Sequence, residues 1–172
     1  MKDITGDLQK KLDIKNPMRV PRMTKIVVNA GVKDAVLDKK NIEKAEAILA
    51  QITGQKPKIT KAKKAIASFK LRKGDEIGLM VTLRGKRMYS FFEKLVSIVL
   101  PRLRDFHGVK RESFDGHGNY TLGLSEYAVF PEVDLAKIDK MQGIELTIVT
   151  TAKSNIEGIA LLEALGMPFK KQ

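Results

Sequence analysis

The chain has 172 residues, of which 43% are apolar and 30% are charged, a composition typical of a globular protein with a sizeable core. It contains no cysteine, which excludes disulfides, cysteine-zinc sites and thiol nucleophiles and favours a reducing compartment. No apolar run approaches the roughly 20 residues needed to cross a bilayer, and we expect no secretory signal from the polar first residues.

The charge is unevenly distributed along the chain. Lys and Arg total 32 against 20 Asp and Glu, which gives a net charge of +12 and favours polyanion partners. Residues 1–111 carry 27 bases and 11 acids, a net charge of +16, whereas residues 112–172 carry 5 bases and 9 acids, a net charge of −4. The sequence therefore predicts a strongly positive surface, a mildly negative one, and a different partner for each.

The first half of the chain alternates helical and strand patterns. A short helical segment is expected before Pro17, and residues 25–29 ("KIVVN") have the β-branched composition of a strand. A helix is predicted over residues 38–53, with Asp38 as its cap and Gly54 as its stop. Its apolar face would contain Ile42, Ala45, Ile48, Leu49 and Ile52.

Two strands are expected next, over residues 65–69 and 77–84, joined by the basic link "KLRKGDE". The chain then turns at Gly85 into a helix that Pro101 ends. Apolar residues recur in it at helical spacing, namely Met88, Phe91, Phe92, Leu95, Val96 and Val99. Tyr89, Phe91 and Phe92 are therefore predicted to belong to the core and not to a base-stacking platform.

The last third predicts short strands over residues 120–124 and 127–130, a short helix after Pro131, and a strand over residues 144–151. The final helix has a capping box of Ser154 and Glu157 and ends at Gly166. The whole pattern predicts the α+β class, with a mostly antiparallel sheet, helices packed on one side, and a single domain over residues 1–172 with a protruding basic loop.

The stretch "SFDGHGNYTLG" (residues 113–123) contains an aspartate and a histidine among three glycines, as a catalytic or metal-binding loop would. The chain has only two histidines, and neither lies at a known metal-ligand spacing. The glycines are equally consistent with positive-φ positions in a shaped surface loop, which is the interpretation we favour.

The run from Lys56 to Lys73 contains eight bases and no acid, a pattern that favours contact with phosphates over a solvated mixed-charge face. Four polar residues lie at strand ends and turns in or beside this basic half, and each is consistent with a local cap or with RNA recognition: Asn29, Gln55, Thr82 and Arg84.

Several long stretches resemble the family of ribosomal protein five of the large subunit, which carries 5S ribosomal RNA. They include "PRMTKIVVNAGV", "ITGQKPKITKAKKAIASFKLRKGDEIGLMVTLRG", "PRLRDFHGVKRESFDGHGNYTLGLSE", "FPEVD" and "LTIVTTAKS", and the likeness covers residues 21–170. The first 20 residues are expected to depart from the longer helical segment of familiar bacterial members.

The resemblance implies a non-catalytic, cytoplasmic protein of the ribosome that binds 5S RNA and helps attach it to large-subunit RNA in the central protuberance, with no cofactor and no metal. The implied 5S-binding set is Asn29, Gln55, Lys58, Lys61, Lys63, Lys64, Thr82 and Arg84. A loop bearing Lys70, Arg72, Lys73 and Gly74 would approach the tRNA in the P site. A loop of Asp115, Gly116, His117, Gly118 and Asn119 would form a subunit bridge with ribosomal protein thirteen of the small subunit.

Two alternatives compete with this hypothesis. The first is a metal-dependent RNA phosphodiesterase with Asp105, His107, Asp115 and His117 as ligands. The second is an RNA chaperone with no preference for 5S RNA over other structured RNA. Cleavage of labelled RNA in the presence of divalent metal would identify the first, and equal affinity for unrelated RNA the second.

Overall fold

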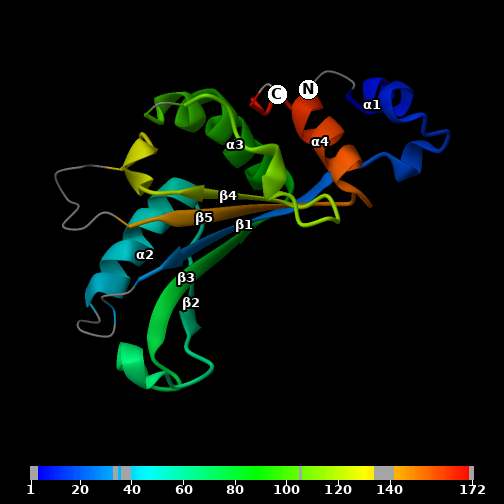
Figure 1. The fold of residues 1–172 in the computed structure, drawn as a ribbon. Coiled ribbons are helices and arrows are strands. Elements are labelled where there is room, and N and C mark those ends of the chain that lie inside the picture. Colours follow the sequence, from blue (N-terminus) through cyan, green and yellow to red (C-terminus); the bar gives the residue numbers. More distant parts are fainter. Residues whose placement is uncertain (1–3, 33–34, 36–39, 105, 134–141, 171–172) are drawn as a thin grey trace. The chain divides into compact units, whose positions relative to one another are not determined.

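The structure is a computed structural model that describes residues 4–32, 35, 40–104, 106–133 and 142–170. Five strands form one sheet in the order β2-β3-β1-β5-β4 (Figure 1). Their bounds are β1 (Met23–Gly31), β2 (Lys58–Lys61), β3 (Glu76–Leu83), β4 (Tyr120–Leu124) and β5 (Ile144–Thr150). The sheet is antiparallel and is combined with four α-helices, which confirms the predicted α+β class. The chain divides into two compact units, residues 1–26, 84–122 and 147–172 (unit 1) and residues 27–83 and 123–146 (unit 2).

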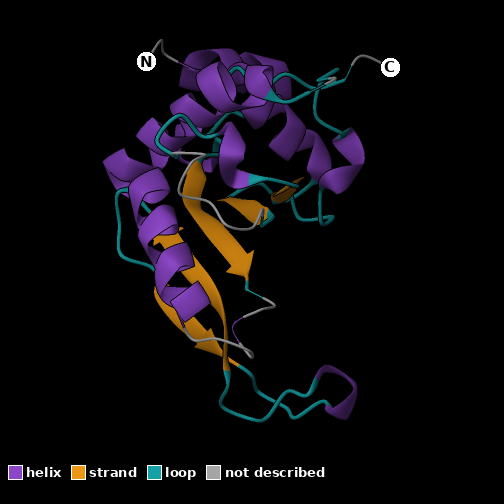
Figure 2. Ribbon diagram, turned by 90° about the vertical axis from the view of Figure 1, so that its left-hand side faces the viewer, coloured by secondary structure: helices purple, strands orange, loops and turns teal. Residues whose placement is uncertain are grey.

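In unit 2, helix α2 (Lys40–Thr53) packs against β3, along one face of the strands (Figure 2). Four of the five residues of the predicted apolar face are buried, and Ile48 is half-buried. The helix ends at Gly54, whose φ of +65° lies in the left-handed region that glycine adopts without strain. The predicted cap Asp38 lies outside the described residues.

The strand predicted over residues 65–69 is wrong. The strand that precedes β3 is β2, which pairs antiparallel with it so that Ile59 lies opposite Leu79. Residues 67–69 instead form a 3₁₀ turn, η3 (Ala67–Phe69), at the tip of a projection that extends beyond the sheet (Figures 1 and 2). An alternating apolar pattern forms a strand only where one face can be buried, and residues 63–70 are all exposed.

Unit 1 contains the helices α1 (Ile4–Leu12), α3 (Gly85–Lys94) and α4 (Asn155–Ala164), and α1 contacts α4. The helix predicted from Gly85 to Pro101 is confirmed, although its last turns change type. They form a π turn, η4 (Leu95–Val99), and then a 3₁₀ turn, η5 (Leu100–Arg102). Five of its six predicted core residues are buried, and Val96 is half-buried. Two further 3₁₀ turns are η1 (Pro17–Arg19) and η6 (Arg111–Ser113).

The strand predicted over residues 127–130 is also wrong, because this segment is a 3₁₀ turn, η7 (Tyr127–Val129). The N–H of Phe130 donates to the carbonyl of Tyr127 over 3.1 Å, and both aromatic side chains are buried. Residues three apart point to opposite faces of a strand but to one side of a single helical turn, so the turn buries both rings. The helix predicted after Pro131 falls largely on residues 134–141, outside the described part of the chain.

The predicted capping box of the last helix is confirmed. The Ser154 hydroxyl accepts a hydrogen bond from the N–H of Glu157 over 3.4 Å, and the Glu157 carboxylate accepts one from the N–H of Lys153 over 2.8 Å. Gly166, with a φ of +92°, follows the end of the helix as predicted.

Candidate nucleic-acid interface

Unit 2 has an open sheet face on the side opposite α2. In β1, Val28 and Ala30 are buried whereas Asn29 between them is exposed. The same alternation in β3 buries its odd-numbered residues Leu79, Val81 and Leu83. The register of β2 and β3 pairs Lys58 with Met80 and Thr60 with Gly78. We therefore define the open face by Asn29, Lys58, Thr60, Met80 and Thr82, which are exposed or half-buried.

Two predicted site residues are in direct contact at the end of β3. Gln55 donates from Nε2 to the backbone carbonyl of Thr82 over 3.4 Å. A turn holds Gln55 in place, because the hydroxyl of the buried Thr53 donates to the carbonyls of Leu49 and Gln55 over 2.8 and 3.0 Å. The turn thus fixes the Gln55 backbone and leaves its amide oxygen available to a ligand.

The polar groups of the open face have few partners within the protein. Among the described residues, the side chains of Asn29 and Thr82 have no hydrogen-bond partner. Arg84, which follows β3 and opens unit 1, is likewise exposed and without a partner in the described chain. Exposed donors and acceptors that the fold does not use are free to bind another molecule.

The lysines of the predicted site differ in how far the protein neutralises them. Lys61 forms an ion pair with Glu76, with Nζ and Oε1 3.3 Å apart. Lys58, Lys63 and Lys64 are exposed and have no acidic partner in the described part of the chain. The net positive charge that faces a ligand therefore comes chiefly from these three lysines and less from Lys61.

The predicted basic loop forms part of the projection, which we define as residues 62–75. Hydrogen bonds close its base, from the N–H of Ala62 to the carbonyl of Asp75 over 2.8 Å and from the N–H of Gly74 to the carbonyl of Ala62 over 2.9 Å. Gly74 has the positive φ, +97°, that its predicted role in a chain reversal requires. The three predicted bases of this loop, Lys70, Arg72 and Lys73, are all exposed.

The glycine-rich loop of residues 113–123 is held together by Asp115. Its Oδ1 accepts the N–H groups of His117 and Asn119 over 2.8 and 3.1 Å, and its Oδ2 accepts from Nδ2 of Asn119 over 2.6 Å. The hydrogen bond from the Asn119 side chain is the main reason that the pKa of Asp115 is lowered, because these bonds favour the charged carboxylate.

The same loop is anchored to β5. The Thr150 hydroxyl donates to the carbonyl of Gly118 over 2.9 Å, and the N–H of Thr150 donates to Oδ1 of Asn119 over 3.0 Å. Asp115 therefore serves the loop itself, and the exposed His117 is the group that the loop presents to solvent. This arrangement is a shaped surface loop, as the glycine pattern predicts.

A metal site receives no support from the arrangement of these residues. Within the described residues, no group of three or more His, Asp or Glu side chains converges as metal ligands would. Asp105, a predicted ligand of the phosphodiesterase alternative, lies outside the described residues. The described helices are all too short or too polar to cross a bilayer.

The fold and these surfaces define a basic α+β protein with an open polar sheet face and a basic projection, features suited to binding an anionic partner. Residues 16–72 match the family described as "Ribosomal protein L5", and residues 76–169 match the family described as the C-terminus of the same ribosomal protein. The chain is 54% identical over 170 residues to the large ribosomal subunit protein uL5 of Anaeromyxobacter sp. strain Fw109-5, covering 99% of this chain and 94% of the relative. The uL5 proteins of Mesoplasma florum and Syntrophotalea carbinolica are also 54% identical, over 168 and 170 residues, covering 98% and 99% of this chain and 93% and 92% of the relatives.

The chain therefore belongs to the ribosomal protein L5 family, as its sequence motifs indicate. It is a structural constituent of the large ribosomal subunit, and ribosomal RNA binding and translation are general properties of this family. The matched segments with the Anaeromyxobacter relative cover 99% of the chain, so they include nearly all of the first 20 residues that the sequence motifs set apart.

Proposed function

We propose that the chain binds 5S ribosomal RNA through the open face of unit 2 and helps attach this RNA to the large subunit in the central protuberance. The observation that carries the proposal is Asn29, an exposed amide in the middle of a strand whose neighbours are buried. An amide held on a rigid strand offers one acceptor and two donors in fixed positions, as recognition of sugars and base edges requires.

The bases around the open face would supply the affinity. Lys58, Lys63 and Lys64 can each neutralise a phosphate and release counterions. Thr82 and the amide of Gln55 lie at one end of β3, which Arg84 follows, so that uncharged hydrogen-bonding groups lie next to cations along the chain. Phosphate contacts would position the RNA and the uncharged groups would read its shape.

The projection and the glycine-rich loop would serve two other partners. Lys70, Arg72 and Lys73 on the projection would contact the phosphates of P-site tRNA. The loop of residues 115–119 would contact ribosomal protein thirteen of the small subunit, with His117 as its outward group. The net charge of −4 on residues 112–172 is suited to a basic protein partner.

A competition gel shift tests the 5S proposal. The purified chain is titrated into labelled 5S RNA at fixed salt, first alone and then with an excess of unlabelled transfer RNA or 5S RNA. We expect unlabelled 5S RNA to compete at least about tenfold better than transfer RNA, a ratio at the low end of what specific recognition provides over non-specific binding. Equal competition would instead identify an RNA chaperone without a fixed address, and cleavage of the label in the presence of Mg²⁺ would identify a nuclease.

A further inference from the structure

The tip of the projection exposes an aromatic ring. Phe69 is 73% exposed, and Ile66, which precedes the turn η3, is 42% exposed. Exposed apolar side chains that occur singly need no explanation on most protein surfaces. Phe69 differs because the backbone around it is fixed and because its neighbours along the chain are cations.

The backbone at the tip is fixed by a second set of hydrogen bonds above the base of the projection. Ile66 and Leu71 exchange two backbone hydrogen bonds of 2.9 and 3.1 Å, and the N–H of Phe69 donates to the carbonyl of Ile66 over 3.3 Å. Lys70 has a φ of +53°, a conformation that non-glycine residues rarely adopt. The N–H of Lys70 donates to the carbonyl of Ala67 over 3.0 Å and helps to hold this conformation. A strained residue that surrounding bonds maintain is a feature of sites that present a side chain for binding.

The charges of the projection identify the kind of partner. It carries five bases, namely Lys63, Lys64, Lys70, Arg72 and Lys73, and one acid. That acid, Asp75, is already engaged, since its Oδ2 accepts the N–H of Arg72 over 2.7 Å. An apolar protein pocket would gain nothing from five cations. RNA offers both phosphates and the flat faces of bases, and aromatic side chains among cations are the usual means of binding unpaired nucleotides.

We propose that Phe69 stacks on an exposed nucleobase of the tRNA that the projection faces, while the flanking bases contact the phosphates on either side. The inference rests on the proposed contact with P-site tRNA and adds an uncharged component to it. The sequence alone predicts contact with phosphates only. The exposed ring indicates that the contact also depends on where an unstacked base lies.

Dissociation of tRNA from the P site of mRNA-programmed ribosomes that carry variant chains tests the proposal. Stacking of one base on an aromatic ring contributes about 1–3 kcal/mol, so Phe69→Ala should speed dissociation about fivefold or more. Phe69→Trp should retain slow dissociation, and Phe69→Leu should not, because leucine keeps the apolar area but loses the aromatic face. The salt dependence of the rate should be unchanged in Phe69→Ala, since no charge is removed. Met18→Ala, which truncates an 86% exposed side chain in unit 1, is the matched control and should have no effect.

The outcomes separate this inference from the proposed function on which it rests. If Phe69→Ala has no effect while the triple change of Lys70, Arg72 and Lys73 to Ser speeds dissociation, the tRNA contact stands and the stacking is wrong. If neither variant has an effect, the tRNA contact itself is wrong. If Phe69→Leu behaves like the unchanged chain, the ring packs in an apolar protein pocket instead.

A second measurement excludes 5S RNA as the source of the base. The chain contains no tryptophan, so Phe69→Trp introduces a single indole whose fluorescence reports the tip alone. Titration of the isolated variant with 5S RNA should give a shifted complex with unchanged fluorescence. Quenching that follows complex formation would show that the tip binds 5S RNA and would overturn the assignment to tRNA.

Discussion

Gly118 lies against Ala152 so closely that a side chain at position 118 would collide with it. A Cβ placed on Gly118 would lie 2.5 Å from the Cβ of Ala152 and 2.9 Å from the carbonyl oxygen of Ser154, distances that atoms in proteins do not adopt. Gly118 also has a φ of +79°. Both constraints act at the point where the glycine-rich loop meets the segment between β5 and α4.

We therefore expect Gly118→Ala to lower the free energy of unfolding by about 2 kcal/mol or more, because the substitution adds a steric clash to the strain of a positive φ. Urea denaturation measures this loss. The control is Gly116→Ala, since Gly116 has a φ of +92° but no atom within 4 Å of an added Cβ. The control should lose only about 1 kcal/mol. Equal losses for the two variants would mean that the loop moves away from Ala152 at little cost.

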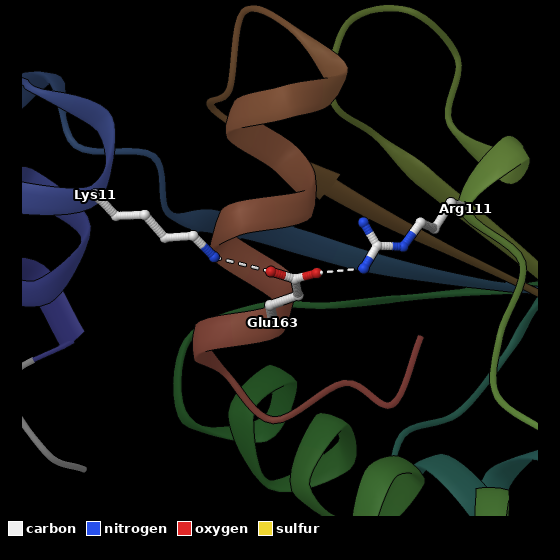
Figure 3. A network of polar contacts seen from close by, with 3 residues as sticks. All are labelled: Lys11, Arg111 and Glu163. Atoms are coloured by element: carbon white, nitrogen blue, oxygen red, sulfur yellow. Dashed lines mark hydrogen bonds and ion pairs between the residues drawn. The ribbon is translucent and has the colours of Figure 1, made fainter. Parts of the chain in front are cut away.

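A second prediction concerns the ion pairs of Glu163, which link three segments of unit 1. Its carboxylate accepts from Nζ of Lys11 and from a guanidinium nitrogen of Arg111, both over 2.8 Å (Figure 3). These contacts, first that with Lys11, lower the pKa of Glu163 below its ordinary value of 4.5. The folded state therefore favours the charged carboxylate, and the stabilisation is present above that ordinary value and lost as the pH falls through the lowered one.

Glu163→Gln should lower the free energy of unfolding at neutral pH by about 1 kcal/mol or less, since all three side chains are partly exposed and solvent screens them. The difference from the unchanged chain should shrink at high salt, on the order of 1 M, and should vanish below the lowered pKa. Glu112→Gln is the control, because Glu112 has no ion pair in the described part of the chain. A difference that persists at acid pH would assign the effect to packing and not to charge.

The sequence predicts much of the fold because its strongest signals are local. The buried face of α2, the capping box at Ser154 and the β-branched strand β1 all follow from residues within a few positions of one another. The contact of Lys11 with Glu163 could not be predicted, because 152 residues separate the two partners and neither has a local pattern that identifies the other.

The two strands that were predicted wrongly share one physical cause. A strand is distinguished from a turn by whether the sheet can bury alternate residues, and this depends on residues distant in the sequence. Residues 65–69 extend beyond the sheet, and the two buried rings of residues 127 and 130 require a turn. The exposure of Phe69 was missed for the same reason, although its position among cations without acids was visible in the sequence.

The amide of Asn29 leads to a prediction about specificity. Asn29→Ala should weaken binding of 5S RNA by about 1–3 kcal/mol if the amide forms hydrogen bonds that water cannot reach. Binding of unrelated RNA should change little, because that binding depends on phosphate contacts. Gln51→Ala on α2 removes an exposed amide from the helical side of the same unit and should leave both affinities unchanged. An unchanged 5S affinity in Asn29→Ala would remove this residue from the interface.

Lys58 and Lys61 should contribute differently to the salt dependence of 5S binding, since Lys58 has no acidic partner among the described residues and Lys61 is paired with Glu76. Lys58→Gln should reduce the slope of log affinity against log salt by about 0.7–0.9, the value for one phosphate contact. Lys61→Gln should reduce it by less, because Glu76 already neutralises part of that charge. The two slopes come from filter-binding titrations over a series of salt concentrations. Equal reductions would mean that the RNA displaces Glu76 from Lys61.

The last prediction separates the roles of His117 and Asp115 in the glycine-rich loop. His117 is exposed and donates only its backbone N–H to the loop, so His117→Ala should leave both the free energy of unfolding and 5S affinity nearly unchanged. Its side chain is the outward group of the proposed bridge, and its removal should weaken association of the ribosomal subunits, measured by sedimentation at limiting Mg²⁺. Asp115→Ala removes three hydrogen bonds within the loop and should destabilise the loop as well as weaken subunit association. Because the pKa of Asp115 is lowered in the folded chain, acid should loosen the loop as the pH falls through that lowered value. Loss of 5S affinity in a folded His117→Ala chain would place this loop on the RNA surface, and normal subunit association in both variants would exclude it from the bridge.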